Sequence, residues 1–425
     1  MVEKGVHTAV SVSQKNDSFD AGRQAALGLS CSPNLVVVYS TIHYKDWGGF
    51  KELLAGIYSV LPEETIIVGG TVAGFIAPQG CYSRGVALFG ISSNDLDLVV
   101  SISKNIKRNP ERAAVECAEE IRDKLRLSRY KNKFLLTHPS GVTTPKIPGY
   151  PKNIRVINNK LISKLLIYGL HLSLILLQKG PGREEVIIEK LSEILPEYKI
   201  LGGSFVDDNK GYSNYQFFNK EVGTNWLITV GIATDLEIDI NSSLGLRKTN
   251  KLLKIDKKST FDLVIERING KKAVDAIVET LNLPDINSKN ILKKTFYSPI
   301  GYEFKGKQYI SVIAFIFGNS IMVTPKMRGD KAYIMTTSGK DLINAVDENL
   351  SKTKGKNICF GLISSCLVRL ETLGSQVYEV HKKLKEHFGE KPFIQVYLVG
   401  EDIYSKELGA RRIAESYNSA IFYQK

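Results

Sequence analysis

Short apolar runs alternate with amphipathic stretches along most of the chain, and the first such unit lies near the N-terminus. Residues 35–39 (LVVVY) form the kind of apolar run that is typical of a buried strand. In residues 47–61 the apolar side chains recur every three or four positions, which predicts a helix that buries one face. A second apolar run ends in IVGGT at 67–71. The pattern therefore predicts a strand, a helix and a strand that leads into a glycine turn.

A second unit repeats this order further along the chain. The tripeptide Leu-Pro-Glu stands at 61–63, shortly before IVGGT at 67–71. It stands again at 195–197, shortly before ILGGS at 200–204. Residues 172–177 correspond to the first strand of the first unit, so we predict a strand there. In residues 187–195 the apolar side chains have helical spacing, which predicts a helix. The shared order predicts an internal repeat.

In each copy the glycine pair is followed by two apolar runs separated by a polar turn. They lie at 86–90 and 95–98 in the first copy and at 227–231 and 235–238 in the second, which predicts pairs of adjacent strands. The first copy then continues into a helix, because Asn-Pro-Glu at 109–111 combines a capping residue, a first-turn proline and an acid.

A weaker echo of the same unit lies near the C-terminus. An apolar run at 358–363 is followed by a helix over 377–388 and a second run at 392–399. Here the glycine pair has become Gly400-Glu401, which we interpret as the same unit adapted to a different task. We expect an α/β fold of mixed sheets and packed helices, with duplicated strand–helix–strand units in the N-terminal half and a related α/β domain after them.

Two segments interrupt the pattern and suggest domain boundaries. Residues 139–151 contain four prolines and two glycines, which disfavours regular structure. Residues 251–259 are rich in lysine, and we interpret them as a link between domains. The expected division is a first repeat over 1–138, a second over 139–252 and a C-terminal domain over 253–425.

Composition narrows the class of protein. The chain has 425 residues, of which 43% are hydrophobic, so it can fill the cores of more than one domain. The longest apolar run, 161–177, contains Lys164 and His171, so we expect no membrane insertion. The first residues do not form a signal peptide, because Glu3, Lys4 and His7 interrupt any apolar core, which predicts a cytoplasmic protein.

Cysteine and charge patterns exclude several kinds of site. The five cysteines are scattered and the six histidines do not cluster, so we expect no disulfide framework, no metal and no cofactor. The net charge of +13 suggests a nucleic-acid-binding or partner-binding module. Because the basic residues are spread in singles and pairs, we instead expect solvated faces and no nucleic-acid partner. The densest stretch, 247–258, is alternatively a basic strip beside a ligand.

The glycine pairs and two charged residues are the main candidates for ligand contacts. Glycines directly after a buried strand let main-chain N–H groups face an anion, although they also serve simply to relieve crowding in a turn. Thr71 and Ser204 would add hydroxyl groups. Arg369 and Glu401 could hold the carboxylate and the ammonium group of a free amino acid, or form a structural salt bridge.

Cys366 raises an enzymatic alternative. The neighbouring Arg369 could lower the pKa of its thiol and make it a nucleophile, but a buried cysteine at a strand end is equally consistent with the pattern. No catalytic triad, phosphate loop or nucleotide fingerprint can be assembled. We therefore assign no catalytic residues and keep, as the alternative, an enzyme that uses Cys366 or a carboxylate on a small acidic substrate.

The order of these motifs resembles the FIST sensory domain family, with N-terminal and C-terminal halves. The resemblance runs from about residue 10 to 423 and includes CLVR at 366–369 and YNSA at 417–420, although Val368 stands where the family favours glycine. It implies a cytoplasmic ligand-sensing module for small molecules such as amino acids. We expect no kinase, cyclase or similar output domain to be attached, so the signal would pass to an unknown protein partner. Together with Thr71 and Ser204, the expected ligand-binding residues are Tyr44, Asp46, Gly69, Gly70, Gly202, Gly203, Cys366, Arg369, Gly400 and Glu401.

Overall fold

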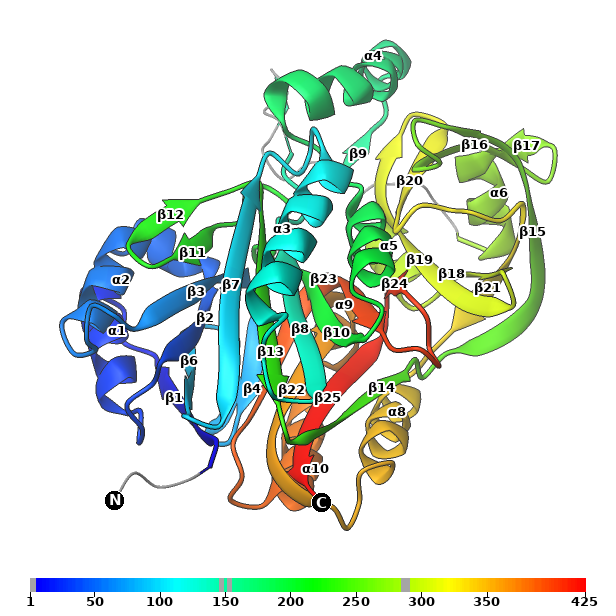
Figure 1. Cartoon of the computed structure of the whole chain (residues 1–425). Helices are drawn as coiled ribbons and strands as arrows, with labels where there is room; N and C mark the ends of the chain where they lie inside the picture. Colours follow the sequence, from blue (N-terminus) through cyan, green and yellow to red (C-terminus); the bar gives the residue numbers. More distant parts are fainter. Residues whose placement is uncertain (1–4, 145–148, 151–154, 284–290) are drawn as a thin grey trace.

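The computed structural model describes residues 5–144, 149–150, 155–283 and 291–425. It is a mixed α/β fold whose strands form three sheets, with helices packed on their faces (Figure 1), so the predicted fold class is confirmed.

The first sheet belongs mainly to the N-terminal part of the chain. Its strand order is β1-β6-β2-β3-β11-β12. β2 and β3 are parallel and are joined by the helix α2, as the sequence predicts. The bounds are β1 His7–Ser13, β2 Leu35–Thr41, β3 Ile66–Val72, β6 Val86–Ser92, β11 Gln216–Phe218 and β12 Glu221–Gly223, with the helices α1 Ser18–Leu27, η1 Ile42–Asp46 and α2 Phe50–Tyr58.

The second and largest sheet is central, and it combines strands from both halves of the chain. Its main order is β14-β25-β22-β23-β10-β8-β13-β7, while β24, β4 and β5 attach at its side. The bounds are β4 Gly74–Ala77, β5 Gly80–Tyr82, β7 Leu96–Lys104, β8 Asn132–Pro139, β10 Tyr198–Ser204, β13 Trp226–Thr234, β14 Glu237–Ser243, β22 Asn357–Cys366, β23 Phe393–Tyr404, β24 Arg411–Ile413 and β25 Tyr417–Gln424.

The third sheet has the order β15-β21-β18-β19-β20-β16-β17, and β9 pairs with β19 at its side. The bounds are β9 Val156–Ile157, β15 Arg247–Ser259, β16 Val264–Ile268, β17 Lys271–Lys272, β18 Ile300–Phe304, β19 Lys307–Phe317, β20 Ser320–Thr324 and β21 Lys331–Thr336. The remaining helices are α3 Pro110–Leu125, α4 Lys160–Leu172, η2 Ser173–Leu177, α5 Glu184–Ile194, α6 Ala273–Thr280, α7 Ile291–Phe296, α8 Gly339–Ser351, α9 Leu367–Leu373, η3 Gly374–Gln376 and α10 Val377–Phe388.

The first two sheets pack face to face, with helices on their outer faces. The alternation along β2 shows why, since Val37 faces the core between the sheets while Val36 and Val38 face α1 and α2. β8 follows the same rule, with Leu136 in the core between the sheets and Leu135 against α3 and α5. Strands that are buried on both faces need a continuous apolar sequence. These strands could therefore be predicted from the apolar runs in the sequence.

Two predicted elements are wrong. Residues 172–177 form the end of a helix that begins at Lys160, and the parallel neighbour of β10 is β8 instead. The apolar segment 160–177 has no proline and many leucines, which suit a helix. The lysine-rich segment 251–259 is no linker, because it lies within the long strand β15.

The strands after each glycine pair also differ from the prediction. β6 belongs to the first sheet and pairs with β1 and β2, whereas β7 pairs with β13 in the central sheet. The polar turn between them therefore carries the chain from one sheet to the other. In the second copy β14 pairs with β25 rather than with β13. The internal repeat and the domain limits stay predictions.

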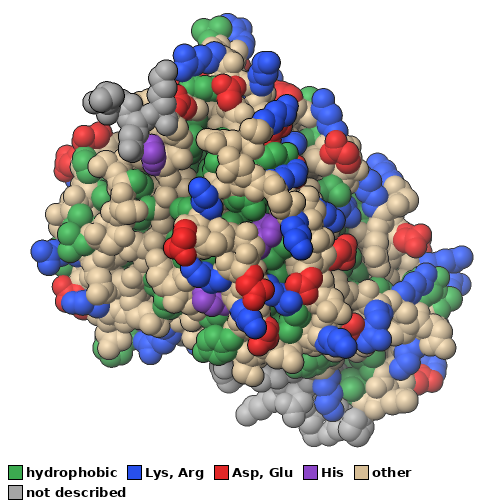
Figure 2. Space-filling view, turned by 90° about the horizontal axis from the view of Figure 1, so that it is seen from below, with side chains coloured by type: hydrophobic (Ala, Val, Ile, Leu, Met, Phe, Trp, Pro, Cys, Tyr) green, Lys and Arg blue, Asp and Glu red, His purple; other side chains and the backbone are tan. Residues whose placement is uncertain are grey.

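On the face seen from below, lysines and arginines are interspersed with aspartates and glutamates (Figure 2). One described helix, Lys160–Leu177, is long and apolar enough to cross a membrane by length and composition, and only 11% of it is buried.

Candidate functional site

The centre of the site is a change of partners along β23. On one side, β22 runs parallel to β23 as far as Cys366, which lies opposite Leu398, and β24 pairs with β23 from Glu401. On the other side, β10 runs antiparallel and ends at Ser204, opposite Val399. The carboxyl ends of β22 and β10 therefore meet at Val399 and Gly400. In open α/β sheets, ligands commonly bind just beyond the carboxyl ends of strands, at the point where the strand order reverses.

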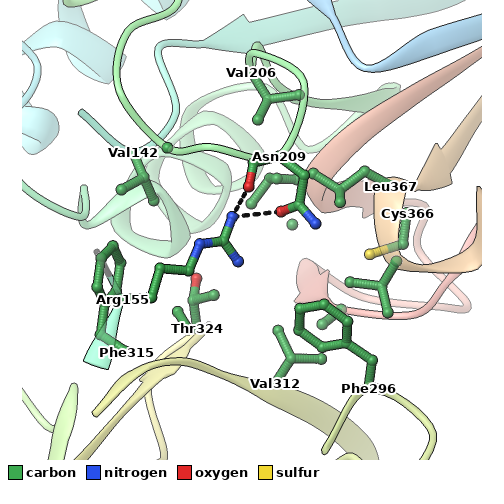
Figure 3. A pocket seen from close by; sticks show the side chains of 16 residues that line it. Val142, Arg155, Val206, Asn209, Phe296, Val312, Phe315, Thr324, Cys366 and Leu367 are labelled. Carbon is green, nitrogen blue, oxygen red and sulfur yellow. Dashed lines mark hydrogen bonds between the residues drawn. The ribbon is translucent and has the colours of Figure 1, made fainter. Parts of the chain in front are cut away.

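A pocket opens at this point, between the central sheet and the third sheet (Figure 3). The space inside it that the centre of a water molecule can occupy is about 60 Å³. Most of its wall is apolar. The lining residues are Val142, Arg155, Val206, Asn209, Gly211, Phe296, Val312, Ala314, Phe315, Thr324, Cys366, Leu367, Val368, Val399, Gly400 and Ala414.

Arg155 is the one cationic side chain among these lining residues. Its Nη2 donates to the backbone carbonyl and to Oδ1 of Asn209, the latter at 2.7 Å. Asn209 is held in turn by a loop that wraps around the Asp207 carboxylate, which accepts from the N–H groups of Gly211 at 2.8 Å and Tyr212 at 2.7 Å. A guanidinium keeps its charge at any physiological pH even though burial lowers the pKa of Arg155. The pocket thus offers a positive charge among mostly apolar lining residues, although the carboxylates of Glu371 and Asp207 also interact with this guanidinium.

Buried acids lie next to the pocket wall. Glu401 follows the lining residue Gly400, and Glu415 follows the lining residue Ala414. Both residues are 0% exposed, and among the described residues neither oxygen of Glu415 nor Oε1 of Glu401 has a hydrogen-bond partner. Burial raises the pKa of Glu415 to about 8 and the pKa of Glu401 well above its usual range. Glu415 is therefore mainly protonated near neutral pH, and burial favours the protonated form of Glu401 as well.

Burial and these two acids also act on Cys366. Burial first, and then the neighbouring Glu401 and Glu415, raise the pKa of its thiol well above the ordinary value. Arg369 interacts with Cys366 but does not outweigh this effect, and its guanidinium donates to backbone carbonyls, at 2.8 Å to Leu244 and at 2.9 Å to Leu342. The thiol lines the pocket in its neutral form, which is a poor nucleophile.

A second arginine lies beside Gly400, whose positive φ of +61° marks an irregularity in the strand that is called the β23 bend below. Arg412 donates through Nη1 to both oxygens of Asp402, at 2.9 and 3.0 Å, and through Nη2 to Ser204 Oγ at 2.6 Å and to the Val399 carbonyl at 3.1 Å. Glu184 lies 4.0 Å away and pairs with the buried Lys107 at 3.0 Å. Because each buried charge has a partner of opposite sign, this cluster can fix the geometry of the bend.

Of the predicted ligand residues, the structure brings one group together. Gly202 lies opposite Asp402, and Gly203 lies opposite Glu401, in the antiparallel pairing of β10 with β23. Cys366 and Gly400 line the pocket itself. Arg369 and Glu401 form no ion pair among the described residues, so the predicted salt bridge between them does not occur, while their role as a ligand clamp stays a prediction.

The glycine pairs are not turns. Gly69 and Gly70 lie within β3, and Gly202 and Gly203 lie within β10. A Cβ at Gly69 would lie 2.0 Å from the Val38 carbonyl oxygen, and a Cβ at Gly202 would lie 1.9 Å from that of Thr137. Each therefore permits close approach of a neighbouring parallel strand, and relief of crowding is the interpretation that the structure favours.

The polar groups beside the glycines bond within the protein. Thr71 exchanges hydrogen bonds with the backbone of Tyr215, at 2.9 and 3.0 Å. Ser204 accepts from Arg412, as described above, and the carbonyl of Gly202 accepts from Ser364 at 2.6 Å. Tyr44 and Asp46 lie in η1, outside the pocket lining, and the buried Tyr44 hydroxyl donates to the Lys15 carbonyl at 2.8 Å.

Several residues of the site had no signal in the sequence. Arg155, Asn209 and Phe296 come from loops or short elements outside the recurring units, and Glu415 sits in a left-handed conformation at φ +60° between two strands. The run of polar residues at 415–419 (ESYNS) inside an otherwise apolar strand pattern was the one available hint. Within the described residues, no group of three or more histidines, cysteines, aspartates and glutamates is placed to hold a metal ion.

No curated protein matches the chain. Among solved structures, it is similar to a cyanuric acid hydrolase from A. caulinodans, with 9% identity over 55% of this chain and 72% of that chain and a TM-score of 0.26. It is also similar to a chorismatase, with 7% identity over 99% of each chain and a TM-score of 0.34. These TM-scores support no conclusion about activity. The model of the FIST N domain matches residues 34–271, more than half of the chain, and this protein therefore belongs to the FIST family.

Proposed function

We propose that this protein is a cytoplasmic sensor that binds an amino acid or a related carboxylate metabolite in the pocket at Val399 and Gly400, and that it signals through a separate protein partner. Membership of a family of sensory domains supports the general role. The observation that carries the ligand class is Arg155, a cation among apolar walls.

Arg155 suits a carboxylate for geometric reasons. Asn209 occupies only Nη2 in the hydrogen bonds that the structure gives this guanidinium. The planar guanidinium fork matches the two oxygens of a carboxylate, and such charge-assisted bonds gain strength where water is excluded. The apolar lining around it would receive the rest of the ligand, and Phe296 and Phe315 offer flat surfaces for a side chain.

The ammonium group of an amino acid would need an acidic or carbonyl partner. Glu401 is our candidate, because Oε1 is unpartnered and the residue follows Gly400 in the pocket wall. An ammonium group beside it would favour the ionised carboxylate and offset the effect of burial on its pKa.

The pocket position also suggests how binding would be transmitted. Val312, Phe315 and Thr324 belong to the third sheet, whereas Cys366 and Val399 belong to the central sheet. A ligand that contacts both sheets binds best when they are held together, and so it shifts the protein toward that arrangement. The output partner would recognise the surface that this shift stabilises.

A thermal-shift screen against amino acids and small carboxylates tests the proposal. A ligand at 100 times its Kd stabilises the folded state by about 2.7 kcal/mol, which is readily measured. We expect Arg155→Ala to abolish the shift and Arg126→Ala, at an exposed position after α3, to preserve it. If no compound stabilises the wild type, or if Arg155→Ala responds as the wild type does, the proposal is wrong.

An enzyme that uses Cys366 on a small acidic substrate is a second candidate. It is favoured by one observation, that Cys366 lines the same pocket as Arg155. The raised pKa of the thiol argues against it, because the thiolate is the reactive form. Turnover of a screened compound that is lost in Cys366→Ser would establish this alternative.

A further inference from the structure

The helix formed by α4 and η2 presents an apolar face to solvent. Along it, large side chains recur every three or four residues and remain exposed: Leu161 at 69%, Leu165 at 64%, Tyr168 at 81%, Leu172 at 58% and Leu176 at 65%. These five residues are called the leucine face below. The helix projects from one end of the molecule, beyond the sheets (Figure 1). An apolar patch of this kind on a folded protein marks an interaction surface.

The opposite side of the helix is attached to the protein. Ile167 and Leu170 pack with residues of the third sheet, and the hydroxyl of Thr260 donates to the Ile167 carbonyl at 3.4 Å. Near the start of the helix, Ser163 Oγ donates to the Ile157 carbonyl at 2.8 Å, and just after its end Gly180 N–H donates to the Thr143 carbonyl at 2.6 Å. With both ends bonded to one folded body, the helix cannot cross a bilayer without unfolding its surroundings, but it can lie flat against a surface.

The charged residues on and near this helix indicate what kind of surface it would contact. Between Asp123 and Glu184 the chain contains no acidic residue, and twelve lysines and arginines fall in this interval, against a net charge of +13 for the whole protein. Lys160 and Lys164 lie exposed on the helix, and Lys179 lies exposed just beyond it. Lys257 of β15 interacts with Tyr168 of the leucine face, although it also pairs with Glu266 at 2.6 Å.

We propose that the leucine face docks on the surface of an anionic lipid bilayer. Leucines and a tyrosine would enter the boundary between headgroups and acyl chains, while the lysines beside them would contact negatively charged headgroups. A second copy of the chain fits less well, because two acid-free helices would bring their lysines together without compensation. The proposal is independent of the pocket and of its ligand.

Vesicle flotation tests the proposal with the full chain. The probes are vesicles of phosphatidylcholine alone and of phosphatidylcholine with phosphatidylserine. We expect binding only to the second kind, and a loss of at least about 100-fold in Leu165→Glu/Leu172→Glu, because two leucines lose their burial. The matched control is Leu127→Glu, since Leu127 is 87% exposed on a different element and should leave binding unchanged. Lys160→Ser and Lys164→Ser should each weaken binding about fivefold.

Three results would overturn the proposal. Equal binding to neutral vesicles would remove the role of charge. Absence of binding, together with a dimer that Leu165→Glu/Leu172→Glu dissociates, would show that a second copy covers the leucine face. Absence of binding with a monomeric wild type would leave a protein partner as the occupant. Thermal unfolding of each variant shows whether the fold is intact, which is expected because the substituted side chains are exposed.

Discussion

Gly203 of β10 lies directly opposite Glu401 of β23 in the central sheet. This pairing joins the second glycine pair to the Gly400-Glu401 dipeptide, although the two motifs are far apart in the sequence. The consequence is that the glycines shape the backbone behind the pocket, whereas the contacts inside it come from Arg155, Phe296 and the ends of β22 and β10.

Gly400→Ala should destabilise the protein and disturb the pocket. Gly400 has φ +61°, and a Cβ there would lie 2.6 Å from Nη2 of Arg412, which pairs with Asp402. We expect a loss of about 2–3 kcal/mol in the free energy of unfolding, from the left-handed backbone and from displacement of the guanidinium. The matched control is Gly306→Ala, at φ +71° with open space around it, which should cost only about 1 kcal/mol. Equal losses in chemical denaturation would contradict the packing role of Gly400.

Whether a part of the fold could be predicted from the sequence depends on how far apart along the chain its interacting residues lie. The run of Val36, Val37 and Val38 predicts a strand that is buried on both faces. This prediction is possible because apolar runs and their alternation are properties of the local sequence. The same rules failed for residues 172–177, since an apolar run alone does not distinguish a strand from a helix.

The pocket required information that the pattern does not contain. Arg155 and Asn209 meet because separate loops converge above the β23 bend, and no spacing along the chain reports such a contact. Gly69 and Gly202 carried a true signal of close backbone approach, but the neighbour that approaches is a strand rather than a ligand. Sequence reasoning therefore located the neighbourhood of the site through Cys366 and Gly400 and missed its charged group.

Glu415 should make the protein less stable as the pH rises. Its folded-state pKa of about 8 exceeds the value of 4.5 that applies to an exposed glutamate, so the folded state holds the proton more tightly than the unfolded state. The stabilisation is fully present below pH 4.5 and is lost between there and about pH 8, by at most about 1.4 kcal/mol for each pH unit. Glu415→Gln should flatten this part of the pH profile, and Glu303→Gln, at an exposed position, should not. An unchanged profile in Glu415→Gln would mean that Glu415 is ionised in the folded protein.

Arg412→Met should be far more costly than the same change at its neighbour. Removing the guanidinium leaves Asp402 buried and unpaired, and breaking a buried pair in this way costs about 3–5 kcal/mol. Arg411 is only partly buried and has no ion pair among the described residues, so Arg411→Met should cost less than about 1 kcal/mol. Urea denaturation of the two variants measures the difference. Similar losses would show that the cluster around Arg412 does not fix the bend.

Cys366 should react slowly with thiol reagents at neutral pH. It is 2% exposed and its pKa is raised by burial and by Glu401 and Glu415, whereas Cys31 and Cys359 are partly exposed. Mass spectrometry of the folded protein after brief alkylation should therefore find label on Cys31 and Cys359 first. Early labelling of Cys366 would support the enzymatic alternative.

The most direct test of the proposed sensor is a crystal structure of the protein with a compound that stabilises it in the thermal-shift screen. We predict electron density for the compound between Phe296 and Gly400, with its carboxylate bonded to the guanidinium of Arg155. Density for the same compound at another place, with Arg155 still bonded to Asn209 alone, would contradict the proposal.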